Sequence, residues 1–224
     1  LENIIPFLEK DGFEVMVLHP RLFLNIPVFF YPEFRLALFV KGKVKKMVED
    51  IKPDYIHIET EDPLGIAMRS VCVRNNFKFT TSFTTNLPEY SNVYFKKYLW
   101  FISPYIYSHV YKYLYWFHQK SSKVMVFTQS LKEELEKYRF KNVVIHFAGV
   151  DTEIFINKKS ITLEKNNSLQ HPIFVYAGRI AKEKNIEEFL DCNLHGTKLV
   201  IGDGPLKKRL EKKYKGAIFL GQKK

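Results

Sequence analysis

Short runs of apolar and β-branched residues alternate along this chain with longer segments in which apolar residues recur every three or four positions. Such alternation is typical of an α/β domain built on a parallel sheet. In the first two thirds of the chain, the pattern predicts strands at 13–18, 55–58, 77–83, 123–127 and 143–146. It also predicts helices at 3–10, 41–51, 65–75 and 129–138.

A polar segment then interrupts the alternation. Residues 158–170 contain few large apolar side chains, which is typical of a linker. After it, strands are predicted at 173–176, 198–201 and 217–220, and helices at 186–190 and 206–214. The sequence therefore predicts an N-terminal Rossmann-like domain over 1–155, a hinge over 156–170, and the first half of a second Rossmann-like domain over 171–224.

Both predicted domains lack expected parts. The first opens on a helix rather than on a strand followed by a glycine turn. The second stops after three predicted strands, whereas a doubly wound domain has about five or six. We therefore expect the chain to be truncated at both ends and to be inactive by itself.

The composition narrows the class of protein. Hydrophobic residues make up 46% of the 224 residues and charged residues 26%, which excludes a disordered chain. The formal net charge of +11 favours an anionic partner, such as nucleic acid, an acidic lipid surface or a phosphorylated small molecule. Solvated helix faces are the alternative explanation, because the basic residues form no continuous block. No signature of a nucleic-acid-binding fold occurs, so we expect no nucleic-acid partner.

Cysteine use and hydropathy indicate a cytoplasmic protein. Cys72 and Cys192 are far apart and outside any C-x-x-C spacing, so we expect neither a disulfide nor a zinc site. The stretch 98–111 has no formal charge but only 14 residues, whereas a membrane-spanning helix needs about 20. The aromatic residues of 94–117 either pack in the core or form an interfacial patch that contacts the inner face of the cell membrane.

The most informative run follows the linker and reads VYAGRIAKEKNIE. A predicted strand ends at Tyr176, Gly178 allows a tight exit, and a helix is expected to start near Lys184 and Asn185. The loop thus lies at the carboxyl end of a parallel strand, where α/β proteins bind ligands. Arg179 and Lys184 would lie beside the N–H groups of a helix start, which suits a phosphate. A basic loop without a ligand is the alternative.

A second run, LVIGDGPL, joins a strand to a helix through Gly202, Asp203 and Gly204. A dinucleotide-binding fingerprint would need a third glycine at the position of Lys207, so that cofactor class is excluded. The run is either a tight strand-to-helix turn or part of the lining of a nucleotide cleft.

In the first domain, polar residues follow two predicted strands. His57 is either a hydrogen-bonded, half-buried histidine or a residue of a cleft rim. Glu59 and Glu61 alternate along the chain, which predicts one outward face and favours a solvated pair over an acid/base role. A hydroxyl-rich run from Thr80 to Tyr90 ends the next predicted strand in the same way.

Together these runs resemble glycosyltransferase family four. In order along the chain, the motifs read DYIHIETEDPLG, FTTSFTTNLPEY, GVDTEIF, YAGRIAKEKNIEEFL and LVIGDGPLKKRLE. The resemblance covers nearly the whole chain and is greatest to the branch that contains bacterial mannosyltransferases and plant sulfolipid synthase. It implies a GT-B fold, in which two Rossmann-like domains face each other across a cleft, with the second domain incomplete here.

The resemblance also implies roles for individual residues. Arg179 and Lys184 would bind the donor diphosphate, where fixed cations stabilise the negative charge that grows on the leaving group. Candidate residues for the donor cleft are Gly178, Gly202, Asp203 and Gly204, and those for the acceptor side are Glu61, Asn86, Glu89 and Tyr90. Family members need no metal, and the chain has no D-x-D motif, so we expect no cofactor besides the sugar nucleotide as co-substrate.

One catalytic position departs from the family pattern. The family usually has a histidine where this chain has Thr84, and threonine does not titrate near neutral pH. The expected function is transfer of a hexose from a nucleotide diphosphate sugar to a lipid or polysaccharide acceptor. The alternative is a non-catalytic module that binds a sugar nucleotide or a partner subunit, as a decayed or split gene would encode.

Overall fold

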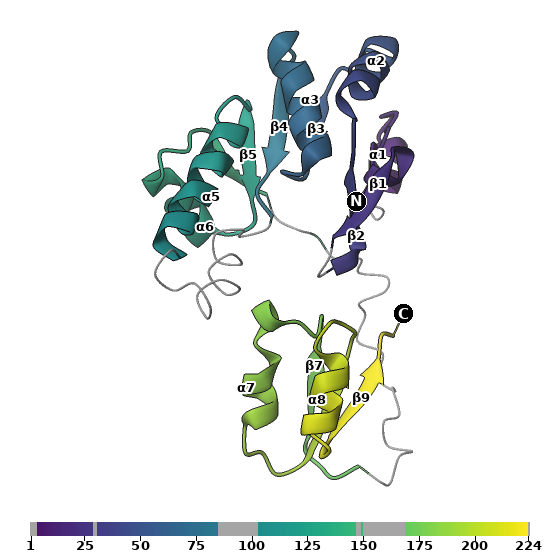
Figure 1. Ribbon diagram of the computed structural model, residues 1–224, viewed down its shortest axis with the longest axis vertical. Coiled ribbons are helices and arrows are strands. Elements are labelled where there is room, and N and C mark those ends of the chain that lie inside the picture. Colours follow the sequence, from purple (N-terminus) through teal and green to yellow (C-terminus); the bar gives the residue numbers. More distant parts are fainter. Residues whose placement is uncertain (1–3, 29–30, 85–102, 147–148, 150–168, 224) are drawn as a thin grey trace. The chain divides into compact units, whose positions relative to one another are not determined.

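The structure is a computed structural model, and it describes residues 4–28, 31–84, 103–146, 149 and 169–223 (Figure 1). The chain divides into two compact units, Leu1–Phe155 and Ile156–Lys224. Each unit contains its own sheet and its own buried apolar residues. The two units are therefore described one after the other.

The sheet of the first unit has four parallel strands in the order β3-β4-β5-β6 (Figure 1). Their bounds are β3 (Ile56–Ile58), β4 (Phe79–Ser82), β5 (Lys123–Val126) and β6 (Val143–Ile145). Each lies within a strand that the apolar runs predict. Because the strands are parallel and in sequence order, all their carboxyl ends lie at one edge of the sheet.

The helices of this unit connect successive strands or precede the sheet (Figure 1). Their bounds are α1 (Ile5–Lys10), α2 (Lys41–Ile51), α3 (Pro63–Arg74), α5 (Ser103–His118) and α6 (Gln129–Lys137). One apolar cluster joins α2 and α3 to β3, and a second joins α5 and α6 to β5 and β6. The helix α3 begins after Asp62, whose carboxylate accepts a hydrogen bond from the Gly65 N–H.

An antiparallel hairpin precedes the sheet, and the hydrophobic pattern does not predict it. A short 3₁₀ helix, η1 (Pro20–Leu22), leads into β1 (Asn25–Val28), which pairs with β2 (Tyr31–Ala37). Pro27 and Pro32 lie within these strands. Proline cannot donate to a strand ladder, so a sequence that contains it argues against a strand except at an edge or a bulge.

The strand predicted at 13–18 is wrong, because the backbone there is irregular. Phe13 is 50% exposed and Met16 is 56% exposed. A strand needs a hydrogen-bonded neighbour, and no sheet of the described residues includes this segment. An apolar run alone therefore does not make a strand here.

The sheet of the second unit contains three parallel strands in the order β7-β8-β9 (Figure 1). The strands are β7 (Ile173–Ala177), β8 (Thr197–Ile201) and β9 (Ala217–Gly221). The connections contain a 3₁₀ helix, η3 (Lys182–Lys184), and the short helices α7 (Ile186–Asp191) and α8 (Lys207–Lys213). The apolar cluster of this unit contains the buried residues Ile180, Ile186, Leu190, Val200 and Leu210.

The described part of the aromatic segment is α5, and one face of this helix is buried. Tyr111, Leu114 and Phe117 are buried, so the prediction of a core helix holds for this face. Tyr105 is 67% exposed and Trp116 is 40% exposed. None of the helices in the described ranges has the length and apolar character needed to cross a lipid bilayer.

Candidate functional site

Polar side chains surround His57 near the carboxyl ends of β3 and β4. Its Nδ1 lies 2.8 Å from Thr80 Oγ1, and its Nε2 lies 2.9 Å from Ser82 Oγ and 3.0 Å from Glu59 Oε2. Thr80 and Ser82 are two residues apart on β4 and therefore lie on the same face of the sheet. Both ring nitrogens of His57 thus have partners, as the hydrogen-bonded interpretation of this histidine predicts.

The Glu59 carboxylate is stabilised by this arrangement. Its hydrogen bond to His57 is the largest influence and lowers the pKa of Glu59 below 4.5, although partial burial acts in the opposite direction. The hydroxyl of Ser82 and the charge of His57 lower this pKa further. Glu59 is therefore ionised at neutral pH.

Glu59→Gln is expected to lower the free energy of unfolding of the first unit modestly at neutral pH. A carboxyl whose pKa is depressed in the folded state stabilises it above the unfolded-state pKa, here 4.5, and loses that effect as the pH falls through the folded-state value. Because the Glu59 side chain is 37% exposed, we expect less than about 1 kcal/mol. Urea unfolding followed by tryptophan fluorescence at a series of pH values measures it.

Glu9→Gln is the matched control, because Glu9 is an exposed carboxylate of the same unit. Its unfolding free energy should track that of the wild type at every pH. A difference for Glu59→Gln that persists unchanged below the folded-state pKa would show that the carboxylate charge is not its source.

A second polar cluster lies on the opposite face of β4 and contains His118, the last residue of α5. His118 Nδ1 lies 2.8 Å from Thr81 Oγ1, and His118 Nε2 lies 3.1 Å from Glu61 Oε1. The side chain of His118 is 0% exposed and that of Glu61 is 8% exposed. The Tyr113 hydroxyl donates to the Glu61 backbone carbonyl. Glu61 is thus held through both its main chain and its side chain.

Burial raises the pKa of the Tyr113 hydroxyl to about 12, and the nearby charges of Glu61 and Asp62 act in the same direction. Tyr113 is therefore a hydrogen-bond donor at any physiological pH. This donor comes from α5, whereas Glu61 belongs to the loop between β3 and α3. The bond fixes that loop against the helix.

Arg69 of α3 holds the end of α5 in place. Its Nε donates to the Phe117 carbonyl at 2.8 Å, and its Nη2 donates to the Trp116 carbonyl at 2.6 Å. The guanidinium also lies over the Trp116 ring, 4.1 Å from its centroid. Two of the carbonyls that a helix leaves unpaired at its C-terminus are satisfied in this way, which places His118 beside β4.

These contacts correct the prediction that Glu59 and Glu61 form a solvated pair. Each carboxylate is hydrogen-bonded to a different histidine, and Glu61 is nearly buried. Thr84 lies in the described part, two residues beyond β4, and is exposed. The other predicted acceptor-side residues, Asn86, Glu89 and Tyr90, lie outside the described residues.

In the second unit, the loops that follow β7 and β8 pair with each other through their backbones. The Gly178 N–H donates to the Ile201 carbonyl, and the Ile180 N–H donates to the Asp203 carbonyl, both at 2.9 Å. The Leu206 N–H donates to the Ile180 carbonyl at 3.1 Å. Backbone hydrogen bonds thus hold together the two loops that contain the predicted donor-binding residues.

Two glycines permit this close approach. A Cβ atom on Gly202 would lie 1.9 Å from the Gly178 carbonyl oxygen, and one on Gly204 would lie 2.4 Å from the Ile180 carbonyl oxygen. Gly202 also has a φ of +144°, which side-chain-bearing residues rarely adopt. Packing of the two loops therefore explains these glycines without any ligand.

The loop after β7 carries Arg179 and Lys184. Arg179 is partly buried, and its carbonyl accepts a 2.9 Å hydrogen bond from the Tyr176 hydroxyl. Lys184 is exposed and ends the 3₁₀ helix η3. The helix α7 begins at Ile186, as the prediction of a helix over 186–190 has it. The N–H groups of Lys184 and Asn185 donate to the Ala181 and Lys182 carbonyls, so these two groups are already hydrogen-bonded.

A pocket of about 370 Å³ opens beside the loop after β8. Its lining residues are Asp203, Gly204, Pro205, Lys207, Lys208 and Glu211. The Asp203 carboxylate accepts from the Gly204 N–H at 2.7 Å and lies 3.7 Å from Lys207 Nζ. Two of the predicted donor-cleft residues thus border a hollow that contains lysine side chains.

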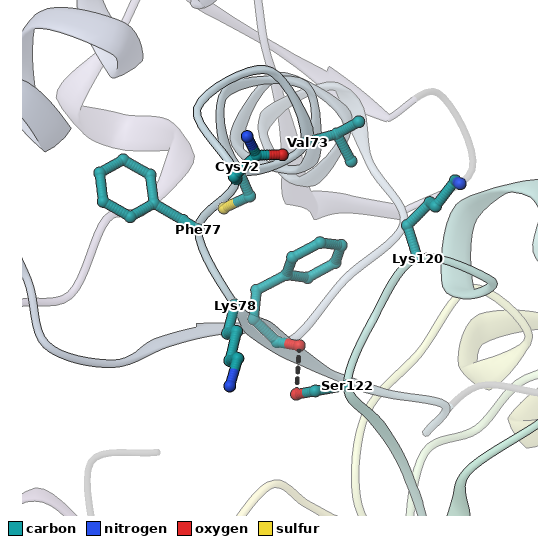
Figure 2. A pocket seen from close by; sticks show the side chains of 8 residues that line it. Cys72, Val73, Phe77, Lys78, Lys120 and Ser122 are labelled. Atoms are coloured by element: carbon teal, nitrogen blue, oxygen red, sulfur yellow. Dashed lines mark hydrogen bonds between the residues drawn. The ribbon is translucent and has the colours of Figure 1, made fainter.

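Another pocket, of about 300 Å³, lies at the amino ends of β4 and β5 (Figure 2). Figure 2 shows Lys78 and Lys120 pointing in different directions, and the Ser122 hydroxyl is occupied by the Phe79 carbonyl. Burial raises the pKa of the Cys72 thiol to about 11, so this thiol is not a reactive thiolate. Because its polar groups do not converge and it lies at the other edge of the sheet, we assign no ligand to it.

The sequence analysis missed His118, Ser121 and Arg69, and it included Thr81 only as a member of the hydroxyl-rich run that ends at Tyr90. His118 ends a run of aromatic residues, and the run as a whole predicts only a buried or interfacial helix. Its partner Glu61 is 57 positions away. One signal in the sequence could have revealed it. The polar imidazole of His118 ends a run of aromatic residues shortly before a predicted strand, and a helix that ends there must have its terminus against the sheet.

Comparison with known proteins identifies relatives of the whole chain. The model of the family Glycosyltransferase Family 4 matches residues 1–154. The Sulfoquinovosyl transferase SQD2 of Arabidopsis thaliana is 24% identical over 251 residues, which cover 98% of this chain and 47% of SQD2. The chain thus spans about half the length of this relative.

A solved structure supports the fold. The Anabaena protein Alr3699/HepE, solved in complex with UDP, is similar with a TM-score of 0.52 and 12% sequence identity, over 99% of this chain and 59% of that chain. At this identity the similarity concerns the fold alone. Together with two parallel sheets, it confirms the predicted α/β class of the GT-B type. Because the family model matches well over half of the residues, the chain belongs to Glycosyltransferase Family 4.

Proposed function

We propose that this chain is part of an enzyme that transfers a hexose from a nucleotide diphosphate sugar to a lipid or saccharide acceptor. In this proposal the first unit contacts the acceptor and the second unit binds the donor. The observation that carries it is the match of Glycosyltransferase Family 4 to residues 1–154. The relatives agree with it, since SQD2 is a sulfoquinovosyl transferase and HepE was solved in complex with UDP.

The donor diphosphate is assigned to the paired loops of the second unit. Arg179 supplies a planar guanidinium, which forms two parallel hydrogen bonds to phosphate oxygens, and Lys184 supplies a compact charge. As the bond to the sugar breaks, negative charge accumulates on the diphosphate, and fixed cations lower the barrier. We assign this stabilisation to the side chains of Arg179 and Lys184 rather than to a metal ion.

A lipid acceptor would bring the first unit to a membrane surface. The exposed rings of Tyr105 and Trp116 on α5 suit the headgroup zone, and the net charge of +11, which belongs to the whole chain and not to this unit alone, favours anionic lipid headgroups. Co-sedimentation with vesicles tests this part. Equal co-sedimentation of the chain with neutral and with acidic vesicles would show that electrostatic attraction to lipid headgroups does not contribute to binding.

Arg179→Ala is expected to weaken UDP binding by about ten- to a hundredfold, because a hydrogen bond to a charged group is lost. Calorimetric titration of the chain with UDP measures the affinity. Lys212→Ala is the control, because Lys212 is an exposed cation of α8 in the same unit. UDP affinity that is the same in both variants would refute the assignment of Arg179. Binding of UDP by the longer protein without any sugar transfer would favour the non-catalytic module.

A further inference from the structure

The hydrogen-bond directions around His118 fix the position of one of its protons. The Ser121 hydroxyl donates to the His118 carbonyl at 2.7 Å, because a carbonyl can only accept. The Thr81 hydroxyl then donates to Ser121 Oγ at 3.2 Å. Because the Thr81 hydroxyl proton is donated to Ser121, Thr81 Oγ1 can only accept a hydrogen bond from His118 Nδ1, which lies 2.8 Å away. His118 Nδ1 therefore carries a proton.

The other ring nitrogen shares a single proton with Glu61. His118 Nε2 and Glu61 Oε1 lie 3.1 Å apart, and one proton must lie between them for a hydrogen bond to exist. It resides on the imidazole, which gives an ion pair, or on the carboxyl, which gives a neutral pair. In both cases the pair is neutral overall, which makes its burial tolerable.

The pair is rigid on the histidine side and reachable on the glutamate side. His118 is 0% exposed, and Arg69 fixes the end of its helix. Glu61 retains 8% exposure and lies in the loop at the carboxyl edge of β3. Gly65 lets α3 approach this loop, since a Cβ there would lie 1.9 Å from the Thr60 carbonyl oxygen. The hydrogen bond to His118 therefore holds the Glu61 carboxylate in a fixed orientation, with a small part of its side chain exposed.

We propose that Glu61 binds a hydroxyl of the acceptor and that His118 is the residue that positions it. This rests on the proposed function and deepens it: the acceptor class is a molecule with a sugar-type hydroxyl, which donates to the second oxygen of the carboxylate. The hydrogen bond is charge-assisted when the shared proton resides on His118. The chain Ser121–Thr81–His118 acts as the support that orients the carboxylate.

Glu61→Gln separates this role from a structural one. The amide N–H₂ of glutamine donates to His118 Nε2, so the buried hydrogen bond and the Nδ1 proton are kept while the carboxylate is lost. With methyl β-glucoside as the probe and nuclear magnetic resonance of labelled histidine as the readout, the His118 signals of the wild-type chain should shift on titration. We expect Glu61→Gln to stay folded, keep the Nδ1–H signal, and bind the probe about tenfold or more weakly.

Two histidine variants test positioning. His118→Gln still donates to Glu61 and should retain most of the probe affinity, whereas His118→Leu should lose it to the same degree as Glu61→Gln. Wild-type affinity in Glu61→Gln, equal affinities in the two histidine variants, or no saturable binding to the wild-type chain would each overturn the inference. UDP titration of the same samples distinguishes failure of this inference from failure of the proposed function, because UDP binding is expected to depend on Arg179 and not on Glu61.

Discussion

Replacing Gly202 by alanine should unfold the second unit. The new Cβ would lie 1.9 Å from the Gly178 carbonyl oxygen, and the φ of +144° is strained for any side-chain-bearing residue. Strain of this kind costs about 1–3 kcal/mol, and separating the loops breaks backbone hydrogen bonds that contribute a further ~0.5–1.5 kcal/mol each. A unit of this size has roughly 3–10 kcal/mol of stability in total.

Amide hydrogen exchange of β7 and β8 measures this loss directly. Both tryptophans, Trp100 and Trp116, belong to the first unit, so their fluorescence should not change and reports that this unit is intact. Gly216→Ala is the control, since a Cβ there meets no atom within 4 Å. Protection factors in Gly202→Ala as high as those in Gly216→Ala would contradict the proposed role of the glycine.

Arg69→Met should destabilise the first unit by about 3–5 kcal/mol, because two carbonyls near the end of α5 lose their donors. These are the carbonyls of Trp116 and Phe117, and the contact of the guanidinium with the Trp116 ring is lost with them. Methionine fills a similar volume, so the effect arises from the missing hydrogen bonds rather than from a cavity. Urea unfolding followed by circular dichroism measures the change.

Arg74→Met is the control for this variant. Arg74 belongs to the same helix but is exposed at its C-terminal end, where a cation contributes only about 0.3–1 kcal/mol. Arg69→Lys should be intermediate, because lysine keeps the charge but lacks the forked donors. If both arginine-to-methionine variants unfold at the same urea concentration, Arg69 does not hold the end of α5.

The sequence was sufficient for the parallel strands because each is a short apolar run between turn signals, a local property. It was insufficient for the hairpin, whose prolines argue against a strand. It also failed for 13–18, because pairing requires a neighbour that the run itself does not reveal.

The candidate site shows the same division. Arg179, Lys184 and the glycines stand out in the sequence because they lie close together between a strand and a helix, and their role in donor binding stays a prediction. The sequence does not reveal the partners of Glu59 and Glu61, because a helix end 57 residues away supplies one of them. Alternation predicts which way a strand residue points, but Glu61 lies beyond β3, where the backbone turns into α3. Only the folded chain brings His118 to it.

The backbone bonds between the loops after β7 and β8 limit how this unit can be re-engineered. The Ile180 carbonyl and N–H are both hydrogen-bonded to the neighbouring loop. Exchanging either loop alone for that of a homologue would therefore disrupt these backbone hydrogen bonds. Both loops would have to be exchanged together for a chimera to keep its fold.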